Sequence, residues 1–364
     1  MKAQFKVLNA ILIVVIIVLG IIAAYGWLRP TQSSTPSSTS LTLEQLAMQE
    51  GKLTIYGVID TSDFVTIISA FVSQYPWAAG EIQYVGLDPG QITTRALSEY
   101  QAGKVQADIL IDTLGSLMPF ILAGAASNCN NPMLSLMNYT LGTYDNKNYT
   151  WCPSYWLPIV MVYNIQKLKS LGLPPPTNWS DLANPKYKGL IAFDDPTILN
   201  VAGSLFTSLY PILGNSTWTN LMKAIAANNP IITESAGEAY DKVASGEAAI
   251  GIGLINDYLE GLEHGAPVGI VWINPVFSLP IATALTKNAP HPNFAKLFLM
   301  WLLSGAGQLA LAKINRVPMN LIIAEGTLLK IMPSGFTVLP AAYNVPDFYT
   351  NPTKWINVLK TIFG

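Results

Sequence analysis

Charged residues and metal-binding side chains are scarce in this 364-residue chain. Lys, Arg, Asp and Glu make up 12% of the sequence, where soluble domains average about 25%. With a formal net charge of −2, a basic surface for nucleic acid is not expected. The two histidines, His264 and His291, and the two cysteines, Cys129 and Cys152, are too few for a Cys/His zinc cluster or a disulfide scaffold. Hydrophobic residues reach 51%, which is enough to bury a sizeable core.

The usual catalytic motifs are missing as well. The sequence has no Gly-x-Ser-x-Gly elbow, no His-Glu-x-x-His pair and no Walker loop, and residues 251–253 (GIG) lack the third glycine of a dinucleotide fingerprint. We therefore predict no catalytic residue, metal ion or cofactor, and a protein that is not an enzyme. A hydrolase with paired carboxylates stays open, because several aspartates follow predicted strands: Asp60, Asp112, Asp194, Asp195 and Asp257.

The N-terminus carries one long hydrophobic run. Residues 7–28 are apolar apart from Asn9, and at helical rise they would span about 33 Å, the thickness of a bilayer core. Lys2 and Lys6 precede the run, which favours a cytoplasmic N-terminus and places everything after Arg29 outside the cell. We predict a retained membrane anchor over residues 1–29. A cleaved signal peptide is the alternative.

A polar tract follows the hydrophobic run. Residues 30–43 are rich in Ser, Thr and Pro and predict a flexible stalk that holds the rest of the chain at the cell surface. Candidate N-glycosylation acceptors occur at Asn138, Asn148, Asn178 and Asn215, so we expect a glycoprotein. In that compartment we expect Cys129 and Cys152 to form a disulfide rather than to remain free thiols.

The remaining chain alternates short β-rich runs with helical patterns. A strand over 53–58 is followed by a helix over 63–75 with apolar residues at helical spacing, and similar units recur to residue 254. The pattern predicts an α/β fold with mainly parallel sheets, including a helix over 197–210. Residues 294–314 are apolar on several faces and predict one buried helix.

Five segments, in order along the chain, resemble one protein family. Residues 50–57 (EGKLTIYG) and 102–109 (AGKVQADI) resemble the opening of substrate-binding proteins of ABC importers, in the ferric-iron-type branch of the type 2 periplasmic binding proteins. Residues 179–189 (WSDLANPKYKG) are similar to that family's W-x-D-L-x-x-P-K-Y-K-G segment, and 246–252 (GEAAIGI) to its G-E-A-A-I-G turn and strand. Residues 316–320 (RVPMN) also match.

The resemblance implies two α/β lobes joined by a hinge, with a small molecule bound between them and delivered to an ABC import permease. We expect residues 44–155 with 269–325 to form one lobe, and 156–268 with 326–364 to form the other. The resemblance also indicates which residues would line the binding site between the lobes. The candidate ligand-binding residues are Asp60, Thr61, Asp112, Thr113, Tyr155, Asp195, Thr197, Asn200 and Tyr258.

The cargo is where the sequence departs from its relatives. Ferric-binding members typically use two adjacent tyrosines, helped by a histidine and a glutamate. Here only Tyr258 matches, because Leu259 replaces the second tyrosine, Asp60 lies where the histidine would be and Thr113 where the glutamate would be. A ferric-iron receptor remains the alternative within the family. Asp195 is a natural helix N-cap that would repel an anion, so we expect a neutral or cationic organic solute. A surface-layer or adhesion protein is a further alternative.

Overall fold

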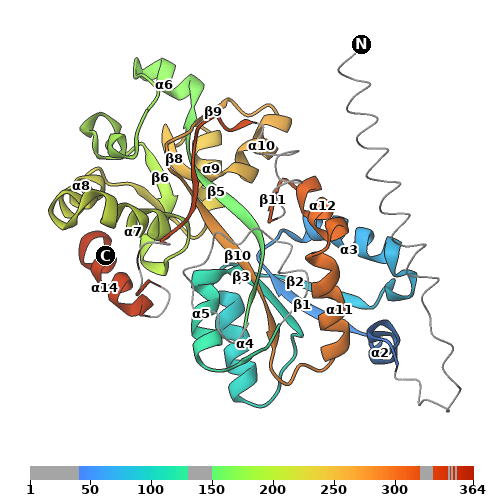
Figure 1. Ribbon diagram of the computed structural model, residues 1–364. Helices are drawn as coiled ribbons and strands as arrows, with labels where there is room; N and C mark the ends of the chain where they lie inside the picture. Colours follow the sequence, from blue (N-terminus) through green and yellow to red (C-terminus); the bar gives the residue numbers. More distant parts are fainter. Residues whose placement is uncertain (1–40, 130–149, 320–330, 343–344, 346, 349–350) are drawn as a thin grey trace, which may run out of the picture. The chain divides into compact units, whose positions relative to one another are not determined.

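The computed structural model describes residues 41–129, 150–319, 331–342, 345, 347–348 and 351–364. The predicted anchor, most of the stalk, Asn138 and Asn148 lie outside these residues. Within the described part, no single helix is long and apolar enough to cross a membrane, although one bent helix pair, treated below, passes by length and composition alone. Residues 42–364 make one compact unit, and its α/β fold has two lobes, each built on its own sheet (Figure 1).

The first sheet combines parallel and antiparallel strands. Its parallel part holds β2 (Ile82–Gly86), β1 (Leu53–Gly57) and β3 (Ile109–Thr113), in that order. Next to β3 run β10 (Val276–Thr286) and then β5 (Cys152–Asn164), each antiparallel to the strand before it. Three short strands complete its edges: β4 (Ala126–Ser127), β11 (Val317–Pro318) and β12 (Val338–Pro340).

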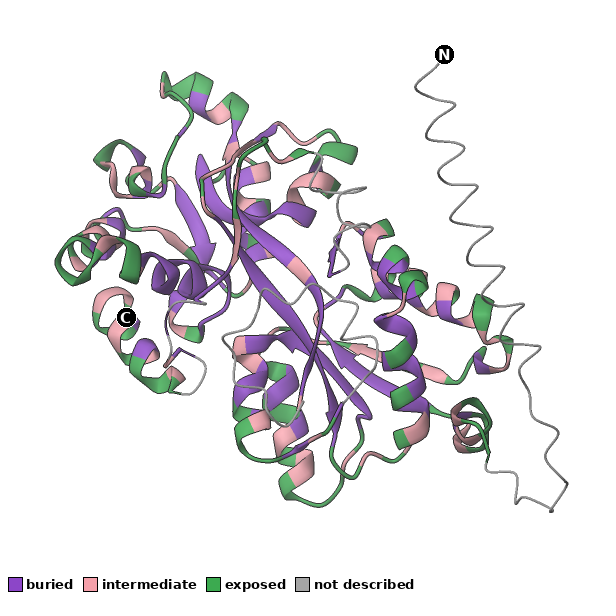
Figure 2. Cartoon of the chain, in the orientation of Figure 1, coloured by how far each residue is buried: buried purple, intermediate pink, exposed green. Residues whose placement is uncertain are grey.

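The second sheet begins on the other half of β5. There β5 pairs antiparallel with β8 (Ile250–Leu254) and β9 (Val268–Val271), and β8 continues in parallel to β6 (Ile191–Asp194) and β7 (Ile231–Thr233). The expectation of mainly parallel sheets was therefore wrong. Both sheets are mixed, because β5 runs through both of them and lies antiparallel to its neighbours. The central strands β1, β3, β10, β5 and β8 are almost entirely buried (Figure 2).

Helices cover both sheets. Those of the first lobe are α2 (Leu43–Glu50), α3 (Thr61–Gln74), α4 (Gln91–Gln101), α5 (Leu114–Leu122), α11 (Pro292–Leu302) and α12 (Gly305–Lys313). The second sheet carries α6 (Ile165–Leu171), α7 (Val201–Leu213), α8 (Asn215–Ala227), α9 (Ala236–Ala244), α10 (Ile255–Glu263) and α14 (Pro352–Phe363). Short 3-10 turns occur at Pro76–Ala78, Trp179–Ala183, Pro185–Tyr187 and Pro196–Ile198.

The helical spacing read from residues 63–75 corresponds to the buried face of α3. Phe64, Ile67 and Phe71 are fully buried on it. The ring of Phe71 packs against α11, with its centroid 5.1 Å from that of Phe298 and 5.2 Å from that of Trp301. Each such aromatic side chain removes a large apolar area from water, so this contact stabilises the helices on the sheet.

The predicted single helix over 294–314 is two helices. α11 and α12 are bent by 72° at the break between them. Ser304 causes the break, because its hydroxyl accepts the backbone N–H of Gly307 and so caps a new helix. This bent pair is the one noted above that passes as a membrane span by length and composition. Most of its apolar residues, among them Phe298 and Trp301, are buried in the core, whereas Met300 and Leu309 are exposed.

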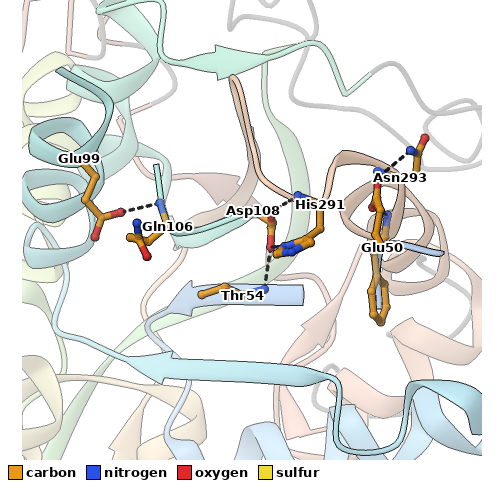
Figure 3. A network of polar contacts seen from close by, with 8 residues as sticks. Glu50, Thr54, Glu99, Gln106, Asp108, His291 and Asn293 are labelled. Carbon is orange, nitrogen blue, oxygen red and sulfur yellow. Dashed lines mark hydrogen bonds and ion pairs between the residues drawn. The ribbon is translucent and has the colours of Figure 1, made fainter. Parts of the chain in front are cut away.

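A network of buried polar groups joins β1, β3 and α11 (Figure 3). Asp108, just before β3, is fully buried and accepts hydrogen bonds from the backbone N–H of Thr54 at 2.8 Å and of His291 at 2.7 Å. The His291 ring Nδ1 lies 3.0 Å from the same carboxylate. Glu50, at the end of α2, accepts the N–H groups of Asn293 and Phe294 in the first turn of α11. These carboxylates satisfy donors that burial would otherwise leave unpaired.

The predicted disulfide between Cys129 and Cys152 is confirmed. Cys152 is the first residue of β5 and is fully buried. The disulfide therefore links Cys129 covalently to the start of β5, the strand that runs through both sheets. The acceptor candidates Asn178 and Asn215 are both exposed.

Candidate functional site

A cavity of about 400 Å³ lies between the two lobes. From the first sheet and its helices it is lined by Asp60, Thr61, Thr113, Tyr155 and Arg316, among others. The second sheet contributes Asn200, Ser235, Asn256 and Asp257. A cavity of this size is typical of small-molecule sites, and a ligand in it would contact both lobes at once.

Several helices begin at this cavity. Thr61 is the first residue of α3, Thr113 caps α5, and Ser235 caps α9 through a hydrogen bond from the Glu238 N–H. Asn200 precedes α7, and Asn256 lies in the first turn of α10. The strands lead into these helices, so the carboxyl ends of both sheets face the same space. This is where open α/β sheets place their ligands.

The turn before α7 differs from the prediction. The expected helix over 197–210 begins only at Val201, after a 3-10 turn and a left-handed Leu199 with φ of 53°. The buried Asp194, rather than Asp195, receives the first N–H groups of α7, from Val201 and Ala202. Asp195 caps the short turn instead, accepting the Thr197 N–H at 2.8 Å.

Glycine at position 203 permits this turn. A Cβ there would lie 2.3 Å from the carbonyl oxygen of Pro196, closer than any side chain allows. Because residue 203 has no side chain, the 3-10 turn at Pro196–Ile198 packs directly against α7. Asn200, between the two, lies at the cavity wall. Sequence periodicity carries no sign of this fold-back, which explains the misplaced helix start.

Four polar atoms at the cavity wall are buried and have no hydrogen-bond partner in the described structure. They are the hydroxyl of Tyr155, Oδ1 of Asn200, Oδ1 of Asn256 and Oδ2 of Asp257. Tyr155, Asn200 and Asn256 are each less than a tenth exposed. A buried polar atom without a partner costs about 1–3 kcal/mol, so folded proteins rarely keep several together. Such a cluster indicates a site whose partners arrive with a ligand.

Carboxylates dominate the electrostatics of the cavity. Burial raises the pKa of Asp257 to about 7, against a smaller lowering effect of Arg316. Arg316 is itself engaged, because its guanidinium lies 3.3 Å from Asp63 and donates to the carbonyl of Ile314 at 2.9 Å. Burial also raises the pKa of Tyr155, against a smaller lowering effect of the neighbouring Arg316, so its hydroxyl stays protonated. The wall therefore offers mostly hydrogen-bond acceptors.

The structure brings five of the predicted site residues together at the cavity wall: Asp60, Thr61, Thr113, Tyr155 and Asn200. The other four do not line it. Asp112 is fully buried and accepts hydrogen bonds from the backbone N–H of Thr113 and of Gly90, and burial raises its pKa to about 7. Asp195 and Thr197 share the 3-10 turn, and Tyr258 packs against the apolar cluster of the second lobe.

The prediction did not include six polar wall residues: Asp88, Gln91, Ser235, Asn256, Asp257 and Arg316. Asp257 had been noted only as a carboxylate after a strand, and Arg316 only as part of the family match. A signal for Asn256 and Asp257 existed, because both directly follow the buried strand β8. Ser235 sits between a short strand and a helix, the usual place for an N-cap, and that structural role hides its second position on the cavity wall.

Comparison with known proteins identifies the class. The sequence profile of the bacterial extracellular solute-binding proteins matches residues 107–335, more than half of the chain. The chain therefore belongs to this family, whose members are binding proteins. An extracellular solute-binding protein is the class of protein that the family and fold define. Its compartment is extracellular or periplasmic.

Individual relatives match part of the chain. It is 28% identical over 156 residues to the phosphoglycerate transport regulatory protein PgtC of Salmonella typhimurium, 43% of this chain and 39% of that protein. An uncharacterized protein of Haemophilus influenzae is 29% identical over 147 residues, 40% of this chain and 42% of the relative. The chain thus matches about two fifths of the length of these relatives.

Solved structures share the fold over most of the chain. The periplasmic binding protein AfuA from Actinobacillus pleuropneumoniae, with fructose-6-phosphate bound, is 21% identical with a TM-score of 0.76, covering 86% of this chain and 98% of AfuA. Iron-bound HitA from Pseudomonas aeruginosa is 18% identical with a TM-score of 0.68, covering 85% of this chain and 99% of HitA. At these identities the likeness shows the fold alone.

Proposed function

We propose that this chain captures one small organic solute in the cavity between its lobes and delivers it to an ABC import permease from the outer face of the membrane. The observation that carries the proposal is the set of four unpartnered buried polar atoms, contributed by both lobes to one cavity. Binding of a solute would complete their hydrogen bonds and hold the lobes together. Family membership and the fold of AfuA and HitA support the same function.

An organic solute fits the wall better than ferric iron. Tyr258, the one tyrosine that matches the ferric-binding pattern, contacts the core of the second lobe and does not line the cavity. No group of three or more His, Cys, Asp and Glu side chains in the described residues is arranged to hold a metal ion. A trivalent cation needs several anionic oxygens close together, whereas amides and hydroxyls suit an organic molecule. Nothing in the family comparison supports the hydrolase alternative.

The binding experiment uses the full chain purified in a mild detergent. Glucose, fructose 6-phosphate, spermidine and ferric citrate are each added in a thermal-shift assay, and native mass spectrometry looks for a copurified molecule. A bound solute should raise the melting temperature by mass action and make the molecule more compact in solution scattering.

Two variants test whether the cavity is the binding site. Asn256→Ala should weaken binding about tenfold or more, because it removes a buried acceptor from the wall. Asn220→Ala, on an exposed position of α8, is the matched control and should leave affinity unchanged. The absence of any shift, copurified molecule or compaction would contradict a receptor function.

We also propose that residues 1–29 anchor the receptor in the cytoplasmic membrane. The support is the hydrophobic run over 7–28, preceded by Lys2 and Lys6. The native protein should remain in the membrane fraction after salt and carbonate washes and should still yield the peptide containing Lys2. A variant lacking residues 1–29 is the control and should be released. A mature protein that begins beyond residue 20 would show a cleaved signal instead.

A further inference from the structure

A second cavity extends from the inter-lobe site. It has a volume of about 630 Å³ and runs between α9 and α10. Four of its lining residues, Asp60, Ser235, Gly237 and Asp257, also line the inter-lobe cavity, so the two spaces adjoin. We call this second space the acidic groove. Its remaining wall includes Glu238, Tyr240, Asp241, Glu260, Gly261 and His264.

Negative charge predominates in the lining of the acidic groove. Five carboxylates line it, those of Asp60, Glu238, Asp241, Asp257 and Glu260, and neither Lys nor Arg does. None of the five takes part in a salt bridge within the described residues. The whole chain has nearly equal numbers of acidic and basic residues, 22 and 20, so this concentration is local. Such a wall attracts cations and repels anions.

A buried hydroxyl at the groove gives independent evidence for a ligand. Tyr240 is only 6% exposed, and its hydroxyl has no hydrogen-bond partner in the described structure. It reaches from α9 to α10, where only a glycine fits: a Cβ at Gly261 would lie 1.5 Å from the Tyr240 oxygen. Burial, followed by the charges of Asp257, Asp241 and Glu260, raises the pKa of Tyr240 to about 12. The neutral hydroxyl can thus accept a hydrogen bond from an ammonium group.

The distribution of the carboxylates over two adjoining cavities favours an extended molecule over a single ion. In the part of the chain that the structure describes, no three His, Cys, Asp or Glu side chains converge on a metal site. Asp60 and Asp257 line both cavities, whereas Asp241 and Glu260 line the acidic groove and not the inter-lobe cavity. A flexible chain with an ammonium group at each end could place one group in each cavity.

The helix N-termini around the inter-lobe cavity do not reverse this preference. A helix N-terminus attracts an anion, but carboxylates of this chain already lie at two of these N-termini. Asp60 occupies the N-cap position of α3 without bonding its N–H groups, and Asp257 lies in the first turn of α10. A phosphate would meet both carboxylates, while Arg316 already contacts Asp63.

We propose that the solute is an extended organic cation with at least two amine groups, one held in the inter-lobe cavity near Asp60 and Asp257 and one in the acidic groove near Asp241 and Glu260. This inference rests on the proposed receptor function and adds the chemical class of its cargo. The solute's methylene chain lies along the apolar parts of the wall, and the Tyr240 hydroxyl and the Asn256 amide oxygen accept hydrogen bonds from its ammonium groups.

Titration calorimetry at low salt, with the full chain in a mild detergent, compares spermidine, 1,4-diaminobutane and butylamine. The two amines with several charges should bind at least about tenfold more tightly than the monoamine, because only they occupy both sites. The double variant Asp241→Asn/Glu260→Gln should weaken spermidine binding about tenfold or more and change butylamine binding less than about twofold. Glu263→Gln, exposed on the same helix and outside the groove, should change neither.

The outcomes separate this inference from the proposed function. Equal affinities for spermidine and butylamine, or an unchanged spermidine affinity in the double variant, would overturn the proposal that the solute carries at least two amine groups. Tighter binding of fructose 6-phosphate or glucose than of any amine would also overturn it while leaving the receptor function intact. If none of these solutes binds and nothing copurifies, the receptor function itself fails.

Discussion

Two sets of buried polar side chains lie in this structure, one around Asp108 at the junction of β1, β3 and α11, and one at the inter-lobe cavity. Around Asp108 each carboxylate oxygen accepts at least one hydrogen bond from Thr54 or His291 (Figure 3). At the cavity, Tyr155 and Asn256 each bury an oxygen atom without a partner. The first set completes its hydrogen bonds within the fold, and the second does not.

The difference distinguishes a structural role from a binding role. Both sets are buried, and both contain carboxylates and neutral polar groups, so residue type alone does not separate them. What separates them is whether removing a group would leave a partner unpaired. Variants of the first set should therefore cost stability, and variants of the second should cost binding with little loss, or even a gain, of stability.

The largest effect is expected for Asp108→Ala. The change leaves the N–H groups of Thr54 and His291 buried without an acceptor, and breaking a buried pair costs about 3–5 kcal/mol. Chemical denaturation followed by circular dichroism would measure the loss. Glu81→Ala, at an exposed position before β2, is the control and should have little effect. A loss below about 1 kcal/mol for Asp108→Ala would remove the contrast between the two sets.

Asp257→Asn is expected to stabilise the ligand-free protein, the opposite of the effect of Asp108→Ala. The fold raises the pKa of Asp257 from 3.8 to about 7, so the ionised form is disfavoured in the folded state. The ionised carboxylate therefore destabilises the folded protein increasingly as pH rises from about 4 to 7, and it has no such effect below that range. At pH 8 the Asn variant should be more stable by about 2 kcal/mol, roughly half the full value of such a shift because the residue is partly exposed.

The pH dependence of Asp257→Asn is measured by denaturation at pH 4 and pH 8. Besides burial, Arg316 and a backbone hydrogen bond at Leu254 lower the pKa of this carboxyl, and the charges of Asp60 and Glu260 raise it. Near pH 4 the variant and the wild type should be nearly equal, whereas Glu263→Gln should match the wild type at both values. A variant that is less stable than the wild type at pH 8 would show that Asp257 stabilises the fold.

Glu50→Ala should destabilise the protein by about 1–2 kcal/mol. The Glu50 carboxylate accepts N–H groups of Asn293 and Phe294 at the start of α11, so the change removes a cap and a favourable charge at the helix N-terminus. Glu50→Gln keeps an acceptor oxygen and should lose less. Thermal denaturation of both variants checks the order, and equal losses would assign the effect to charge alone.

The smallest change in stability is expected for two buried tyrosines, which form a matched pair of variants. The Tyr56 hydroxyl donates to Glu99 at 2.9 Å, whereas the Tyr155 hydroxyl has no partner. Tyr56→Phe should cost about 1 kcal/mol, and Tyr155→Phe should cost nothing or stabilise the ligand-free protein slightly. Ligand affinity should fall only in Tyr155→Phe. Equal losses of stability in the two variants would mean that Tyr155 has a partner within the fold.

The sequence predicts positions at strand ends better than it predicts side-chain direction. Asp60 was expected at the site because it follows a predicted strand, and Thr61 and Asn200 were expected there through the family resemblance. All three line the cavity. Asp112 satisfies the same criterion, yet it turns inward to accept backbone N–H groups of Thr113 and Gly90. Which way a carboxylate turns depends on which N–H groups the tertiary structure brings near it.

Other features depended on contacts between distant segments. The acidic groove combines Asp241 on α9 with Glu260 on α10, and nothing in their sequence spacing places them on one wall. The mixed sheets follow from β5, whose hydrophobic run predicts a buried strand but carries no sign of its partners on both sheets. The family resemblance supplied the two lobes, which periodicity alone did not.

The route of the chain through the two sheets has a consequence for folding during synthesis. In the first sheet, β10 lies between β3 and β5, yet β6, β7, β8 and β9 all precede it in the chain. Asp108 meets His291 across a separation of 183 residues. Every strand of the second sheet has therefore been synthesised before the central strand of the first exists. Such long-range pairing is slow to form, and one edge of β3 stays unpaired until β10 is available.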